Sequence, residues 1–215
     1  MMSKRMRVLV ACEYSGVVRD AFLRRGHDAV SCDILPTESD LGPHIKGDVL
    51  PLLEEPWDLV IAHPPCTYLC QSAVQYLYRE PERWMQLADA ATFFLHCWHA
   101  NSPRVAVENP TMHRYARDLV GIRPTFCVQP FWFGDFASKR TCFWVRGLPT
   151  LIPTQPLYDP DGKKAPPWTA TTRTSKKRSL TFKAIAAAMA DQWGDFTMQQ
   201  VHEHARHTDP HRLPA

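Results

Sequence analysis

Short hydrophobic runs recur along the first two thirds of the chain and predict the strands of a buried sheet. They cover residues 7–11, 28–32, 57–62 and 104–107. Segments with helical spacing of apolar residues lie between them, notably 17–25, which ends at a glycine, and 81–100. A regular alternation of short apolar strands and amphipathic helices is typical of a parallel sheet covered on both faces.

The second part of the chain has a different character. Residues 125–133 and 141–145 are rich in aromatic residues, and we expect them to be the last strands of the sheet. Six of the 19 prolines then fall between positions 149 and 167, which is typical of a loop. We therefore expect an α/β core, a Pro-rich basic insert, a helix returning to the core and a flexible His-rich tail, at residues 1–146, 147–178, 179–197 and 198–215.

Composition and charge narrow the class of protein. The 215 residues are 45% hydrophobic and 22% charged, as in an ordinary soluble domain, and the net charge of +3 permits a polyanionic partner without requiring one. No apolar run approaches the roughly 20 residues of a membrane-spanning helix, and the N-terminus lacks the pattern of a signal peptide. The seven cysteines form an odd set without paired spacing. This favours a reducing compartment, the cytoplasm, over a disulfide scaffold.

Candidate chemistry lies directly after the predicted strands, because ligands of open α/β sheets bind beyond the carboxyl ends of the strands. A glycine at the first strand-to-helix turn, Gly16, allows a cofactor to approach the backbone, and Asp33 after the second strand can accept hydrogen bonds from ribose hydroxyls. An ordinary turn with a solvated carboxylate explains these two residues equally well.

The segment Pro64-Pro65-Cys66 is more specific. Two prolines hold the loop rigid and present the Cys66 thiol from a stiff support at a strand end. Glu108 follows the 104–107 strand, so the pair suits a nucleophile with a proton donor. Cys66 and Cys70, four residues apart, also fit a chelating or redox pair. Most other cysteines, including Cys127, are expected to be buried core thiols.

The order of these motifs resembles that of the DNA cytosine carbon-5 methyltransferases, especially small phage-type members. The resemblance runs from Arg7 to Val145. Its motifs are Glu13-Tyr14-Ser15-Gly16, Asp33, Gly47-Asp48-Val49, the 58–66 strand with its Pro-Pro-Cys end, Val107-Glu108-Asn109-Pro110 and Ser138-Lys139-Arg140. It implies a Rossmann-like, S-adenosylmethionine-dependent methyltransferase fold with a mostly parallel sheet.

The resemblance also implies a cofactor and its contacts. S-adenosylmethionine would be held by Tyr14, Ser15, Gly16, Asp33, Ile34, Asp48 and Pro64. In this arrangement Gly16 meets the amino acid moiety and Asp33 the ribose. Ile34 covers the adenine face and Asp48 accepts from its amino group.

For catalysis, the resemblance implies that Cys66 adds to carbon 6 of cytosine, Glu108 holds or protonates ring nitrogen 3 and Arg140 contacts the pyrimidine. DNA would be the partner, with the target base flipped out of the duplex or presented on a single strand. No metal is expected. Further substrate contacts would come from Pro65, Asn109, Lys139, Arg173, Lys176 and Lys177, the last three in a basic stretch suited to phosphates.

The chain departs from the family in several places. Cys142 replaces the second arginine of the strand that begins near Arg140, Tyr14 replaces a glycine, and the last helix lacks the usual Gly-Asn-Ser. Only 32 residues, 147–178, stand where the family has a recognition domain. We therefore expect a loose or short sequence preference, because reading a specific sequence requires an element that enters a groove.

Three other functions remain open. A methyltransferase acting on exocyclic amino groups uses an acid-Pro-Pro-aromatic loop that is similar to His63-Pro64-Pro65, although Cys66 and Glu108 argue against it. The same chemistry on a cytosine nucleotide would explain the missing recognition domain. A catalytically inactive module that binds DNA or cofactor is suggested by Cys142 and Tyr14.

Overall fold

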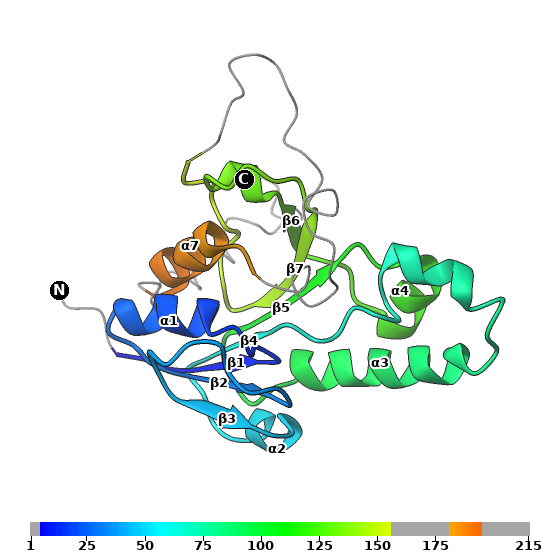
Figure 1. The fold of residues 1–215 in the computed structure, drawn as a ribbon, viewed down its shortest axis with the longest axis horizontal. Coiled ribbons are helices and arrows are strands. Elements are labelled where there is room, and N and C mark those ends of the chain that lie inside the picture. Colours follow the sequence, from blue (N-terminus) through cyan, green and yellow to red (C-terminus); the bar gives the residue numbers. More distant parts are fainter. Residues whose placement is uncertain (1–4, 156–180, 195–215) are drawn as a thin grey trace, which may run out of the picture.

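Figure 1 shows a computed structural model of the chain, in which residues 5–155 and 181–194 are described. Its seven strands are β1 (Arg7–Ala11), β2 (Asp28–Asp33), β3 (His44–Lys46), β4 (Leu59–Ala62), β5 (Val105–Pro110), β6 (Phe126–Val128) and β7 (Thr141–Arg146). Its helices are α1 (Val17–Arg24), α2 (Leu50–Leu53), η1 (Gln71–Tyr76), α3 (Arg83–Trp98), α4 (Arg114–Val120), η2 (Pro130–Trp132) and α7 (Lys183–Gly194).

The strands form one sheet in the order β3-β2-β1-β4-β5-β7-β6. The first five are parallel, and their order is that of a doubly wound dinucleotide-binding sheet. A hairpin completes the sheet, since β7 runs antiparallel to β5 and β6 antiparallel to β7. The predicted fold class is confirmed: the chain forms a Rossmann-like α/β fold with a mostly parallel sheet and helices on both faces.

Two hydrophobic cores lie on opposite faces of the sheet. Leu59 and Ile61 of β4 pack toward α1 and α7, whereas Val60 and Ala62 pack toward α2, α3 and α4 (Figure 1). Side chains alternate between the faces of a strand, so a strand covered on both sides must be apolar throughout. All four residues of β4 are buried, which explains its uninterrupted apolar run.

The structure confirms most predicted elements and corrects one. The run at 125–133 was expected to be a single strand, but β6 ends at Val128 and η2 follows. Pro130 explains the break, because it cannot donate a ladder hydrogen bond. The sequence pattern did not predict β3, α2, η1 or α4. Across residues 5–155 and 181–194, none of the helices has the length and apolar character needed to span a membrane.

Candidate active site

The predicted site residues gather at one edge of the sheet. Because β1, β2, β4 and β5 are parallel, their carboxyl ends lie together. His63, the first residue after β4, donates its backbone N–H to the carbonyl of Ala11 at the end of β1, at 3.0 Å. The next strand along the sheet carries Glu108 and Asn109 within β5. The turn after β1 and the Pro-Pro-Cys loop therefore face the same edge.

The turn between β1 and α1 is held by its own side chains. Glu13, buried beneath it, accepts hydrogen bonds from the backbone N–H of Val18 at 2.6 Å and of Arg19 at 3.2 Å. Burial raises the pKa of Glu13, while nearby His63 and these hydrogen bonds oppose the rise. The Ser15 hydroxyl also donates to Glu13, at 3.3 Å. Glu13 thus caps the helix, a role that the sequence did not assign to it.

Gly16 is required by packing within the protein. It has φ of +75°, and a Cβ at this position would lie 2.6 Å from Nη2 of Arg19. Arg19 is fully buried and pairs with Asp20 at 2.8 Å. It also donates to the carbonyl of Ser39 at 2.9 Å. The arginine therefore fixes the loop after β2 against the start of α1.

The ends of β2 and β3 carry the residues expected to hold a nucleoside. Asp33 ends β2, and its Oδ1 accepts from the N–H of Leu35 at 2.9 Å. The adjacent Ile34 is 74% exposed, so an apolar surface lies next to a carboxylate. Asp48 accepts from the N–H of Leu50 at 3.0 Å and thereby caps α2. A ribose beside Asp33 and an adenine ring against Ile34 fit this arrangement of groups.

Glu108 is held by a residue that the sequence analysis mentioned only as part of a loop. Nδ1 of His63 lies 3.1 Å from Oε2 of Glu108, and both side chains are buried. Burial raises the pKa of Glu108, but the hydrogen bond from His63 and the charges of Lys139 and His63 lower it below its usual value. Oε1 of Glu108 and Nε2 of His63 are buried without a hydrogen-bond partner among the described residues. Such atoms are typical of a site that completes its hydrogen bonds with a ligand.

The Cys66 thiol is paired with the Cys70 thiol. This hydrogen bond, burial and the charges of Cys70 and Glu108 raise the pKa of Cys66, whereas Lys139 lowers it. The pKa of Cys70 falls to about 5, because Cys66, the Ser72 hydroxyl and two backbone N–H groups at the start of η1 stabilise its thiolate. The two thiols therefore shift each other's pKa in opposite directions.

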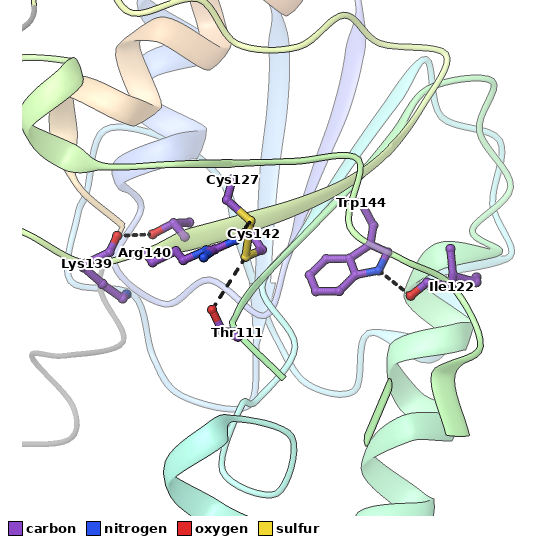
Figure 2. The surroundings of a disulfide bond; sticks show 8 residues. Thr111, Ile122, Cys127, Lys139, Arg140, Cys142 and Trp144 are labelled. Carbon is purple, nitrogen blue, oxygen red and sulfur yellow. Dashed lines mark hydrogen bonds between the residues drawn. A yellow bond between two sulfur atoms is a disulfide. The ribbon is translucent and has the colours of Figure 1, made fainter. Parts of the chain in front are cut away.

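Lys139 and Arg140, both expected near the substrate, differ in what they contact. The charge of Lys139 acts on Cys66 and Glu108. The guanidinium of Arg140 instead donates to Sγ of Cys127 at 3.6 Å (Figure 2). Asn109 lies on the Cys66 side, since its Nδ2 donates to the carbonyl of Pro64 at 2.9 Å. The structure thus brings Lys139, rather than Arg140, into electrostatic contact with the candidate nucleophile.

A disulfide joins Cys127 and Cys142, contrary to the expectation of free thiols. Figure 2 shows it between β6 and β7, where the two residues are direct partners in the antiparallel register. Cys142 is also the register partner of Asn109 in β5. The position that holds an arginine in the resembled family is therefore occupied here by a cross-link at the rim of the site.

Of the remaining predicted site residues, two are described by the structure and three are not. Tyr14 is buried in the turn after β1, and Pro65 is exposed in the loop before Cys66. The predicted phosphate contacts Arg173, Lys176 and Lys177 lie outside the described residues. Most of the predicted insert, 147–178, lies there too.

Comparisons with known proteins find similarity only among solved structures. No family model and no curated protein matches the chain. A solved E. coli structure, described as a "putative DNA modification methyltransferase encoded within prophage", is similar at 17% sequence identity and a TM-score of 0.46. The similarity covers 72% of this chain and 52% of that one. The chain therefore spans about half the length of that structure.

Proposed function

We propose that the chain is an S-adenosylmethionine-dependent methyltransferase that modifies carbon 5 of cytosine in DNA. One observation carries the proposal: at the sheet edge beside the cofactor-type turn, Oε1 of Glu108 is buried without a hydrogen-bond partner among the described residues, and the next residue, Asn109, holds the Pro-Pro-Cys loop through the carbonyl of Pro64 at 2.9 Å. The charge of Lys139 lowers the pKa of both Cys66 and Glu108. A nucleophile, an acid-base group and a cation within one electrostatic cluster are the groups that this reaction needs.

The cofactor would be held by the groups beyond β1 and β2. The backbone at Gly16 suits the amino acid moiety, the carboxylate of Asp33 the ribose hydroxyls and the exposed Ile34 the adenine face. Asp48, already capping α2, has a second oxygen for the adenine amino group. Once bound, S-adenosylmethionine supplies the electrophilic methyl group.

The protein's residues would activate the base. Carbon 5 of cytosine is a weak nucleophile until the Cys66 sulfur bonds to carbon 6 and pushes the electron pair of the 5,6 double bond toward carbon 5. The proton that the Cys66 thiol loses when its sulfur bonds to carbon 6 would pass to Glu108. Oε1 of Glu108, which has no hydrogen-bond partner among the described residues, would donate this proton to ring nitrogen 3 and take it back when the thiolate leaves. After methyl transfer, loss of the carbon 5 proton and expulsion of the Cys66 thiolate restore the ring.

Three neighbouring residues would position these groups. His63 fixes Oε2 of Glu108 and leaves Oε1 for the base. Asn109 anchors the Pro-Pro-Cys loop through the carbonyl of Pro64. Lys139 favours the Cys66 thiolate and can contact the pyrimidine oxygen, a role that the sequence offered to Arg140 as well. Arg173, Lys176 and Lys177 remain proposed phosphate contacts.

The proposal is tested by product analysis with matched thiol variants. Purified protein is incubated with S-adenosylmethionine and DNA, and the nucleosides are identified by mass spectrometry. We expect 5-methylcytosine from the wild type and about 10⁴-fold less or none from Cys66→Ala, since covalent catalysis is lost. Cys32→Ala, which removes a buried thiol away from Glu108, serves as the control. DNA carrying 5-fluorocytosine should form a covalent adduct that requires Cys66.

The same assay separates the other functions. N-methylated bases that persist in Cys66→Ala would contradict carbon-5 chemistry and indicate an amino methyltransferase. Modification of free deoxycytidine nucleotides alone would move the substrate from polymer to nucleotide, as the short 147–178 insert allows. No product with any cytosine substrate, despite cofactor binding, would indicate an inactive binding module.

A further inference from the structure

A cluster of aromatic and arginine side chains lies beside the Pro-Pro-Cys loop and takes no part in the chemistry described above. It is built from η1, the start of α3 and the start of α4, which lie together at one end of the molecule (Figure 1). We call it the aromatic–arginine surface. It consists of Tyr68, Tyr76, Tyr78, Arg79, Arg83, Trp84, Arg114 and Tyr115.

Three rings of this surface, those of Tyr76, Tyr78 and Trp84, are exposed, and Tyr78 and Trp84 are packed against neighbouring rings. Tyr78 is 67% exposed and Trp84 39%, and their rings pack edge to face with centroids 6.1 Å apart. Trp84 packs on Tyr115 in the same manner at 5.0 Å, and the hydroxyls of Tyr78 and Tyr115 are hydrogen-bonded. Rings braced by one another lose little further freedom when a ligand stacks on them.

The charge of the surface is positive. The surface contains three arginines, Arg79, Arg83 and Arg114, and two glutamates, Glu80 and Glu82, lie beside them. The guanidinium of Arg83 lies 4.8 Å from the ring centre of Tyr68 and pairs with Glu80 at 3.1 Å. Arg114 covers the ring of Tyr115 at 4.7 Å, is exposed and has no ion pair among the described residues. Cations interleaved with exposed rings are the combination that binds single-stranded nucleic acid.

The surface is rigidly joined to the candidate nucleophile. Tyr68 lies two residues after Cys66, and its carbonyl is hydrogen-bonded to Nε2 of His113 at 2.9 Å, directly before α4. Cys70 forms a backbone bridge with Met112. A strand whose target base reaches Cys66 would therefore pass over the rings of this surface.

We propose that the aromatic–arginine surface binds the unpaired strand next to the target cytosine. Bases stack on Tyr78 and Trp84, and Arg79 and Arg114 meet the phosphates. The proposal rests on the proposed function for the identity of the polymer. It gives the enzyme an affinity for single-stranded DNA that does not depend on sequence, because every base has a face that can stack.

The test measures binding separately from catalysis. Fluorescence anisotropy follows a labelled single-stranded oligodeoxynucleotide of about 12 nucleotides with the Cys66→Ala protein. In that background, Tyr78→Leu combined with Trp84→Leu should weaken binding about 10-fold or more, since stacking on two rings is lost while apolar side chains remain. Met85→Ala, which shortens an exposed neighbour outside the cluster, should bind like the parent. Arg114→Gln should reduce the dependence of affinity on salt.

The outcomes separate this inference from the proposed function. Equal binding by the leucine variant, or tighter binding of duplex than of single strand, overturns the inference even if 5-methylcytosine is formed. Loss of binding in the leucine variant supports it even if no cytosine is modified. If the leucine variant does not fold, judged by circular dichroism, Trp84→Phe and Tyr78→Phe replace it, and unchanged affinity in Arg114→Gln at every salt concentration then overturns the inference. Wild-type self-association that the variants abolish, without DNA binding, would instead assign the surface to a second copy of the chain.

Discussion

At the scale of single residues, the surroundings of Cys66 and Cys70, four positions apart, shift the pKa values of their thiols in opposite directions. Contact with Cys70, burial and the charge of Glu108 raise the pKa of Cys66, while Cys66, Ser72 and the start of η1 lower the pKa of Cys70. The raised pKa makes the Cys66 thiol less open to oxidation and alkylation, because the thiolate is the reactive form.

The acidity of Cys66 should respond to its neighbours in opposite directions. Cys70→Ser removes the largest cause of the raised pKa, so alkylation of Cys66 should begin at lower pH than in the wild type. Lys139→Gln removes the opposing charge and should move alkylation to higher pH. Peptide-level mass spectrometry after iodoacetamide treatment across a pH series measures both changes.

Arg140→Gln serves as the control in this series, since Arg140 contacts Cys127. A Cys66 alkylation profile that Cys70→Ser leaves unchanged would contradict the thiol pair.

The sequence offered Cys66, Glu108 and Asn109 as candidates because each follows or ends a recognisable apolar run. It could not assign the acidity of Cys66 or the partner of Glu108, because these depend on atoms from different strands. His63 illustrates the difference: 45 positions separate it from Glu108, yet the parallel register of β4 and β5 places their side chains 3.1 Å apart. The preference for Lys139 over Arg140 likewise needed the direction of each side chain.

At the scale of elements, the hairpin of β6 and β7 closes the sheet and carries the disulfide. The strands are three and six residues long, and β6 lies at the edge of the sheet. A short edge strand contributes few ladder hydrogen bonds, so a covalent link to β7 supplies stability that the ladder lacks. The register that makes Cys127 and Cys142 partners could not be read from the sequence, because η2 and a loop separate the two strands.

Reducing this disulfide should destabilise the protein measurably. The two cysteines are 15 positions apart, and a link that closes a loop of this size contributes about 3 kcal/mol to the free energy of unfolding. Urea denaturation with and without dithiothreitol measures the loss. The Cys127→Ala, Cys142→Ala double variant should show no effect of reductant.

A thiol count tests the same link directly. The denatured wild type should titrate five thiols before reduction and seven after it, since the other five cysteines are free. Seven thiols without reductant, or equal sensitivity of wild type and double variant, would contradict the disulfide.

At the scale of the whole molecule, the two cores explain why the fold could be predicted. The strands 7–11, 28–32 and 57–62 and the helices between them are strongly periodic, and their alternation determines the parallel half of the sheet. The two strands of the hairpin were predicted as well, although their antiparallel pairing was not, and the small elements β3, α2 and α4 carry too few apolar positions to be recognised. The strands that carry the candidate site at their carboxyl ends are therefore the part of the sheet that the sequence predicts best.

That edge should couple ligand binding to global stability. S-adenosylmethionine at about 100 times its Kd would stabilise the folded protein by about 2.7 kcal/mol, which raises the Tm by about 5 to 10 °C for a chain of this size. Asp33→Asn keeps an acceptor for the N–H of Leu35 but loses the charge that holds the ribose, so affinity should fall about 10-fold or more. Asp40→Asn, an exposed acid in the same loop, should behave like the wild type. A Tm that S-adenosylmethionine leaves unchanged at millimolar concentration would show that this edge does not bind the cofactor, and an equal rise in both variants would place the nucleoside away from β2.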